Sequence, residues 1–194
     1  MSNLIILFTL LLLWILILLG LKKMKMNFFK FMIGSLGLFT IAMVFLSGFL
    51  EMGLSLAIAN SLKVLENLTH YFQVFAGNSI ITMDTKSGII SMLINYECSG
   101  VIEMLVFTSL AIFFPFGSVL RKAFSIVMGN VYIYISNIIR IMSIIFITKT
   151  FGAEAYYVAH TLVARIIFFA FMLLLYYFVF TFTQLKYQNV GDIK

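Results

Sequence analysis

The chain has 194 residues, of which 63% are hydrophobic and only 10% are charged. This composition excludes a water-soluble domain, because a core of this size cannot bury so much apolar surface, and it is typical of membrane proteins with several spans. The net charge is +6, but the basic residues form short clusters at the ends of apolar runs, so we interpret them as topology signals and expect no nucleic-acid partner.

Several apolar stretches are long enough to cross a bilayer as helices, since a hydrocarbon core takes roughly 20 residues. The first lacks the basic start and the small-residue cleavage site of a signal peptide, so we interpret it as a membrane anchor. We predict an all-α integral membrane protein that forms a single membrane domain over residues 1–194, with about five transmembrane helices. The predicted spans cover about residues 4–21, 31–50, 99–116, 124–147 and 161–182.

The basic residues indicate how the spans are oriented, because lysine and arginine near span ends favour the cytoplasmic side. They occur between the first two predicted spans, between the third and fourth, and after the fifth. All three places lie on one side if the N-terminus is outside and the C-terminus is cytoplasmic. The residues are Lys22, Lys23, Lys25, Lys30, Arg121, Lys122 and Lys186.

One connection, residues 51–98, is long enough to fold outside the bilayer. Its first half repeats apolar residues at helical spacing from Leu62 to Phe75, which predicts a helix that lies in the membrane interface. Its second half, residues 79–96, has two apolar runs on either side of a glycine-containing turn at residues 84–88, which predicts a hairpin. We expect helix and hairpin to form a small extracytoplasmic cap over the spans.

Polar and ionisable side chains inside a span are costly, so they are candidates for function. Asn137 and Arg140 lie three residues apart in the fourth span and share one helical face. His160 opens the fifth span from outside, and Cys98 marks the outside entry to the third. The predicted topology therefore brings Cys98, Arg140 and His160 to about the same depth.

These residue types suit nucleophilic catalysis. A thiolate is a good nucleophile, and a neighbouring histidine, a cation or a helix N-terminus promotes its formation. Ser99 and Gly100 leave backbone N–H groups open toward an incoming carbonyl oxygen. Arg140 can hold an oxyanion or a substrate carboxylate, and His160 can pass a proton to a leaving amine. With one cysteine and two histidines, we expect no disulfide, no metal and no cofactor.

The sequence resembles the exosortase/archaeosortase family of multi-spanning cysteine transpeptidases. The resemblance covers about residues 77–169 and is carried by Glu-Cys-Ser-Gly at 97–100 before a span, Asn-Ile-Ile-Arg at 137–140 near the outer end of the next, and His160 at the start of the one after. It implies that the cysteine is the nucleophile, the arginine stabilises oxyanion or substrate, and the histidine is the acid/base. The chain has fewer spans than many relatives.

The resemblance also implies substrates and location. Substrates of such enzymes are surface proteins that end in a short recognition motif, one membrane helix and a basic cluster. The enzyme cleaves near the motif and transfers the new C-terminus to an acceptor, here unknown, with a lipid or a glycan as candidates. The implied location is the plasma membrane of a prokaryote, with a multi-pass protein whose active site faces outside.

Other interpretations stay open at this stage. Asn137 supports the site, or it joins spans through an interhelical hydrogen bond. Ser99 positions backbone, contributes to an oxyanion hole or serves as an alternative nucleophile. A non-enzymatic membrane subunit of surface polysaccharide assembly or export would use Arg140 and Arg165 to bind an anionic lipid-linked sugar. A metal-dependent hydrolase using Cys98, His160 and His70 would be sensitive to chelators, but it lacks the usual His-Glu spacing.

Overall fold

The computed structural model describes residues 2–85, 88–115 and 118–182. Its long helices are α1 (Ser2–Lys23), α2 (Asn27–Thr69), α4 (Val101–Phe113), α5 (Val119–Phe151) and α7 (Ala164–Tyr176), and its short ones are α3 (Tyr96–Ser99) and α6 (Ala155–Val158). Two π-helical segments, η2 (Ala159–Val163) and η3 (Tyr177–Thr181), extend α7 at both ends, while β1 (Gln73–Phe75), η1 (Ala76–Asn78), β2 (Ile80–Thr85) and β3 (Gly88–Leu93) connect α2 to α3.

Three helical stretches in the described part of the chain are long and apolar enough to cross a membrane. They are α2, α5 and the continuous helix over residues 155–181, while α4 is apolar but has only 13 residues. The chain is therefore an all-α membrane protein with a small sheet, as the composition predicts. The number of spans and the orientation stay predictions.

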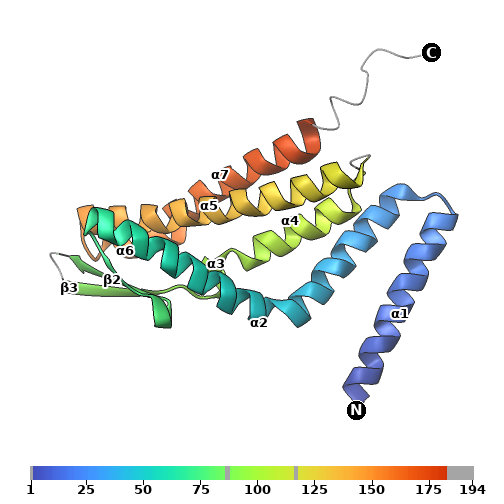
Figure 1. Cartoon of the computed structure of the whole chain (residues 1–194), viewed down its shortest axis with the longest axis horizontal. Helices are drawn as coiled ribbons and strands as arrows, with labels where there is room; N and C mark the ends of the chain where they lie inside the picture. The colour runs from blue at the N-terminus through green and yellow to red at the C-terminus, as the bar shows by residue number, and fades with distance from the viewer. Residues whose placement is uncertain (1, 86–87, 116–117, 183–194) are drawn as a thin grey trace.

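The helices form a bundle with the sheet at one end (Figure 1). α4 packs against α2 and α5, and α7 packs against α5. α1 lies beside the first half of α2, where the Trp14 indole donates a hydrogen bond of 3.0 Å to the Ile33 carbonyl. Figure 1 also shows that α2 changes direction near its middle, so that its second half runs toward the sheet.

The predicted interfacial helix is not a separate element, and this part of the prediction is wrong. α2 continues without interruption to Thr69 and ends at His70, whose backbone is left-handed with φ of 55°. The apolar residues beyond it belong to other structure, because Phe75 lies in β1 and pairs with Ile80. The Glu66 carboxylate stabilises this ending, since it accepts a hydrogen bond of 2.8 Å from the Val74 N–H. Helical spacing alone did not reveal where the chain changes to a strand.

A hairpin forms where the turn signal predicts it. β2 and β3 pair antiparallel with Ile81 opposite Met92, and β1 adds a third strand on the other edge of β2. Side chains alternate along a strand, so one face of this sheet is apolar and buried. That face packs with the second half of α2 and the end of α5. Its shared core includes Ile58, Leu62, Val74, Ile81, Met83, Met92, Ile141, Ile144 and Ile145.

A second apolar core lies deeper in the bundle, between α4, α5 and α7, and includes Phe107, Ile133 and Phe168. The Phe107 ring is fully buried and contacts the rings of Tyr176 and Phe180, with centroids 6.1 and 5.9 Å away. On its α5 side, Phe107 lies directly against Gly129, where an added Cβ would be 2.1 Å from two ring carbons. Gly129 therefore allows α4 and α5 to approach closely.

We expect Gly129→Ala to lower the stability of the protein by about 1–3 kcal/mol, because the fully buried Phe107 ring would have to move away from the added Cβ. Alanine is the better helix former by about 1 kcal/mol, so a destabilisation would show that packing outweighs helix propensity. The measurement is thermal unfolding in detergent, with Gly48→Ala as the control, since nothing lies within 4 Å of a Cβ added there. An unchanged melting temperature in Gly129→Ala would contradict this packing argument.

Candidate active site

Cys98 lies in a helical turn of its own. It is the third residue of α3, and its N–H donates a hydrogen bond of 2.9 Å to the Asn95 carbonyl. Gly100, with φ of 75°, then redirects the chain before α4 begins at Val101. The sequence placed Cys98 immediately before the first turn of a span. The structure corrects this, because the left-handed conformation at Gly100, which glycine adopts without strain, separates the two helices.

The Cys98 thiol contacts His160, with 3.4 Å between Sγ and Nε2. His160 belongs to the π-helical segment η2, in which the Ala164 N–H donates to the Ala159 carbonyl five residues earlier. Its imidazole stacks on the ring of Tyr156, at a centroid distance of 5.7 Å and an interplanar angle of 27°. Among the described residues, no other side chain forms a hydrogen bond with His160. Ring stacking therefore helps to hold the orientation in which Nε2 faces the thiol.

The environment of Cys98 opposes ionisation. Its side chain is 2% exposed, and this burial raises the pKa of the thiol above its ordinary value, as do the charges of Glu97 and Glu103. The Arg140 and Arg165 guanidinium groups act in the opposite direction and lower it, but burial outweighs them. The expectation of a depressed pKa is therefore wrong. A thiol whose pKa is raised is protonated near pH 7.

Two side chains of α5 hold the backbone around Cys98. Asn137 is fully buried, and its Nδ2 donates a hydrogen bond of 2.7 Å to the Cys98 carbonyl. Arg140, 5% exposed, donates from Nη1 to the Glu97 carbonyl at 3.1 Å. Both use the face that their three-residue spacing predicts. Asn137 therefore joins α5 to α3 through an interhelical hydrogen bond, and the acceptor of this bond is the backbone of the candidate nucleophile.

Arg140 keeps part of its hydrogen-bonding capacity unused. Its guanidinium carbon lies 5.3 Å from the centroid of the Phe168 ring, a cation–π contact. Its buried Nε has no hydrogen-bond partner in the part of the chain that the structure describes. A buried donor without a partner is costly, and a ligand in the adjacent space can remove that cost.

The two other predicted supporting residues also lie at the site. Ser99 is fully buried, and its hydroxyl donates a hydrogen bond of 3.0 Å to the Tyr96 carbonyl, which closes the turn of α3. A Cβ added at Gly100 would lie 3.5 Å from Asn137 Nδ2, so this glycine lies close to α5 as well as turning the chain. Ser99 and Gly100 therefore both position the backbone around Cys98, and the Ser99 hydroxyl already donates its proton to the Tyr96 carbonyl.

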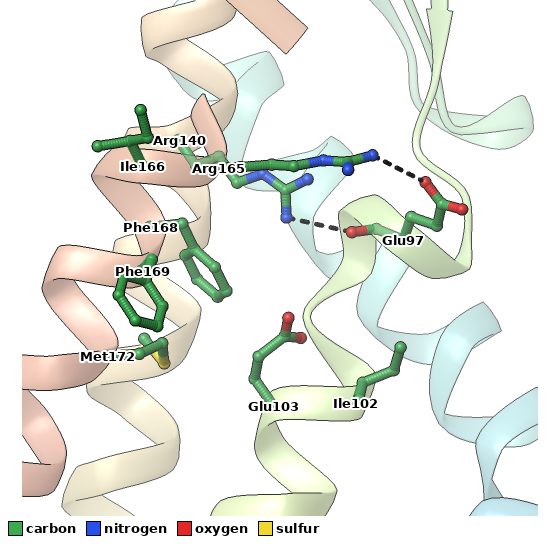
Figure 2. Close-up of a pocket in the computed structure, with 9 residues that line it drawn as sticks. All are labelled: Glu97, Ile102, Glu103, Arg140, Arg165, Ile166, Phe168, Phe169 and Met172. Atoms are coloured by element: carbon green, nitrogen blue, oxygen red, sulfur yellow. Dashed lines mark hydrogen bonds and ion pairs between the residues drawn. The ribbon is translucent and has the colours of Figure 1, made fainter. Parts of the chain in front are cut away.

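A pocket of about 670 Å³ adjoins these residues (Figure 2). Arg165 and Glu97 form an ion pair of 3.9 Å at one end of the pocket, and apolar side chains surround Glu103 toward the other end. The Phe107 contacts with Tyr176 and Phe180 described above join the helices deeper in the bundle, so the pocket occupies the space where α4 and α7 lie apart. The lining residues are Glu97, Ile102, Glu103, Arg140, Arg165, Ile166, Phe168, Phe169 and Met172.

Sequence reasoning missed the stacking of Tyr156 and the contact of the Glu97 carbonyl with Arg140. Tyrosines near span ends usually belong to interfacial belts, yet Tyr156 stacks on His160, and its only signal is a spacing of four residues within a helix. Glu97 contributes its carbonyl to Arg140 and its carboxylate to Arg165. No group of three His, Cys, Asp or Glu side chains in the described segments is arranged to hold a metal ion.

The fold and the site define a helical membrane protein in which a buried cysteine contacts a half-buried histidine. Residues 1–177 match the family described as transmembrane exosortase. The chain belongs to this family. No curated protein and no solved structure matches it.

Proposed function

We propose that the protein is a membrane-embedded cysteine protease/transpeptidase that cleaves the C-terminal sorting signals of surface proteins at the outer leaflet and transfers the cleaved proteins to an acceptor. The observation that carries this proposal is the 3.4 Å contact between Cys98 Sγ and His160 Nε2. Membership of the transmembrane exosortase family supports it. A thiol and an imidazole in hydrogen-bond contact can act as the nucleophile and the base of an acyl transfer.

In this proposal His160 first acts as a base. Nε2 accepts the thiol proton while Sγ attacks the scissile carbonyl carbon, so the thiolate forms only as the new carbon–sulfur bond forms. Such concerted transfer suits a buried thiol with a raised pKa. Arg140 donates to the developing oxyanion from the part of its guanidinium that Glu97 leaves unused. The carbon–nitrogen bond then breaks, and His160 returns the proton to the leaving amine.

The non-enzymatic alternative draws on the same pocket. Arg140 and Arg165 both line it, and two guanidinium groups can bind an anionic lipid-linked sugar. That function has no use for the contact between Cys98 and His160. Chemical blocking of the single thiol therefore separates the two functions, because it stops acyl transfer and leaves anion binding at the arginines in place.

The rate at which iodoacetamide alkylates Cys98 tests the proposed pair directly, since the chain has no other cysteine. Because burial raises the pKa of the thiol, we expect the wild-type rate to continue rising with pH beyond about 8.5, the ordinary pKa of cysteine. Near neutral pH we expect His160→Ala to be slower by roughly tenfold, since the base is missing. The two rates converge at high pH, where hydroxide removes the proton.

The matched control is the other histidine. His70 ends α2 in the left-handed conformation, which asparagine tolerates better than alanine, so the control variant is His70→Asn. We expect its alkylation profile to coincide with that of the wild type. Equal rates for wild type and His160→Ala across the whole pH range would contradict the proposal, because Nε2 would then have no effect on the thiol.

A further inference from the structure

Glu103 is a carboxylate without a partner in the pocket. It lies in the first turn of the apolar helix α4 and is half-buried. It forms no hydrogen bond or ion pair with any residue that the structure describes, whereas Glu97 is paired with Arg165. An ionised group in an apolar helix is costly unless it serves a ligand or a partner. Glu103 is therefore the free negative charge of this pocket.

Arg140 is the complementary positive group. It is nine-tenths buried or more, its Nε is unpaired within the described segments, and it lines the same pocket. Figure 2 shows the Glu103 carboxylate pointing from α4 toward the side on which the Arg140 guanidinium lies, with Phe168 and Phe169 across the pocket. Glu103 also lies close enough to Cys98 for its charge to raise the pKa of the thiol. The pocket is thus lined by a carboxylate without an ion-pair partner among the described residues and by a guanidinium whose Nε is unpaired.

We propose that Glu103 binds the amino group of the acceptor, and that the acceptor is a primary amine. This inference rests on the proposed function. When an amine attacks the Cys98 thioester, the tetrahedral intermediate carries a negative oxygen and a positive nitrogen. Arg140 stabilises the oxygen and Glu103 the nitrogen, an arrangement of fixed charges that favours this intermediate over the one formed by water.

The nitrogen–carbon bond forms and the carbon–sulfur bond breaks, which gives an amide and the Cys98 thiolate. The proton that nitrogen loses ends on Sγ, passed by His160. The apolar wall of the pocket, which includes Ile102, Phe169 and Met172, suits an amine carried on an apolar chain. A water-borne amine would reach Glu103 with less apolar contact.

The test measures how much of the acyl group on Cys98 is transferred to an amine and how much to water. The full-length protein in liposomes is acylated with a small thioester of N-acetylglycine, then offered dodecylamine in the bilayer or glycinamide in solution, and both products are quantified by mass spectrometry. We expect amide to exceed acid for wild type, and Glu103→Gln to lower the ratio of amide to acid by roughly tenfold through loss of the charged contact. If the ratio of amide to acid is higher with dodecylamine, the acceptor belongs to the bilayer. If the ratio is higher with glycinamide, the acceptor belongs to the water phase.

Glu154→Gln removes the same charge from an exposed site outside the pocket, and we expect it to keep the wild-type ratio. Equal ratios for wild type and Glu103→Gln, with Cys98 acylated in both, would overturn the role of Glu103 and leave the proposed function intact. A wild-type protein whose Cys98 is not acylated faster than that of His160→Ala would overturn both.

Discussion

We expect Cys98→Ser to abolish the proposed cleavage of C-terminal sorting segments while the protein remains folded and inserted. Serine nearly preserves the volume of the side chain and can form a hydrogen bond with His160, so the buried site keeps its packing. Its hydroxyl is a much weaker nucleophile than a thiol. We expect processing to fall by at least about 10³-fold, as for the loss of nucleophiles in other acyl-transfer enzymes. The measurement is release of the C-terminal fragment from such a surface protein in membranes that contain the full chain.

The adjacent hydroxyl supplies the matched comparison. Ser99 donates its hydroxyl to the Tyr96 carbonyl, so we expect Ser99→Ala to lose activity only through a looser turn, by far less than Cys98→Ser does. Normal processing in Cys98→Ser together with complete loss in Ser99→Ala would assign the nucleophile to the serine. That outcome would contradict the cysteine mechanism.

Arg140→Ala is the second large effect that we expect. The change removes the donor to the Glu97 carbonyl, the cation above the Phe168 ring and the proposed donor to the oxyanion. Loss of one oxyanion donor costs on the order of 10²–10³ in rate. Arg140→Lys keeps the charge but has no planar fork to bind two acceptors in fixed directions, so we expect it to recover only a small part of the lost rate.

The rate of Cys98 acylation by a small thioester reports this effect without knowledge of the natural substrate. Arg121→Ala is the control, because Arg121 lies on the same helix about 28 Å away along its axis. If Arg140→Lys reacts as fast as the wild type, a positive charge alone suffices and the proposed forked contact is unnecessary.

Much of the helical architecture could be predicted from apolar length, because a membrane span must satisfy its backbone internally and therefore appears as a long apolar run. Helices occupy the predicted stretches near 31–50, 124–147 and 161–182. The hairpin could also be predicted from the sequence, because two apolar runs flank a turn with glycine. The end of α2 could not be predicted from the sequence. Strand β1 is only three residues long, and its apolar residues continue the helical spacing of the preceding segment.

The candidate site was predictable in its members but not in its electrostatics. The predicted topology placed Cys98, Arg140 and His160 at about the same depth, and helical spacing placed Asn137 and Arg140 on one face. The contact between Cys98 and His160 is a finding of the structure. The raised pKa of Cys98 depends on how deeply tertiary packing buries the thiol, which no local pattern records. The contact of Arg140 with the Glu97 carbonyl was not predictable either, because it depends on the turn at Gly100.

The π-helical segment at Ala159–Val163 sets the angle between the His160 and Arg165 side chains. In a regular α-helix, side chains five residues apart point about 140° away from each other. Hydrogen bonds that span five residues instead bring such positions onto nearly the same side. His160 can therefore meet Cys98 while Arg165 meets Glu97. Adding or deleting one residue here would turn all that follows by about 100°, so the spacing of this segment is as constrained as the identity of its side chains.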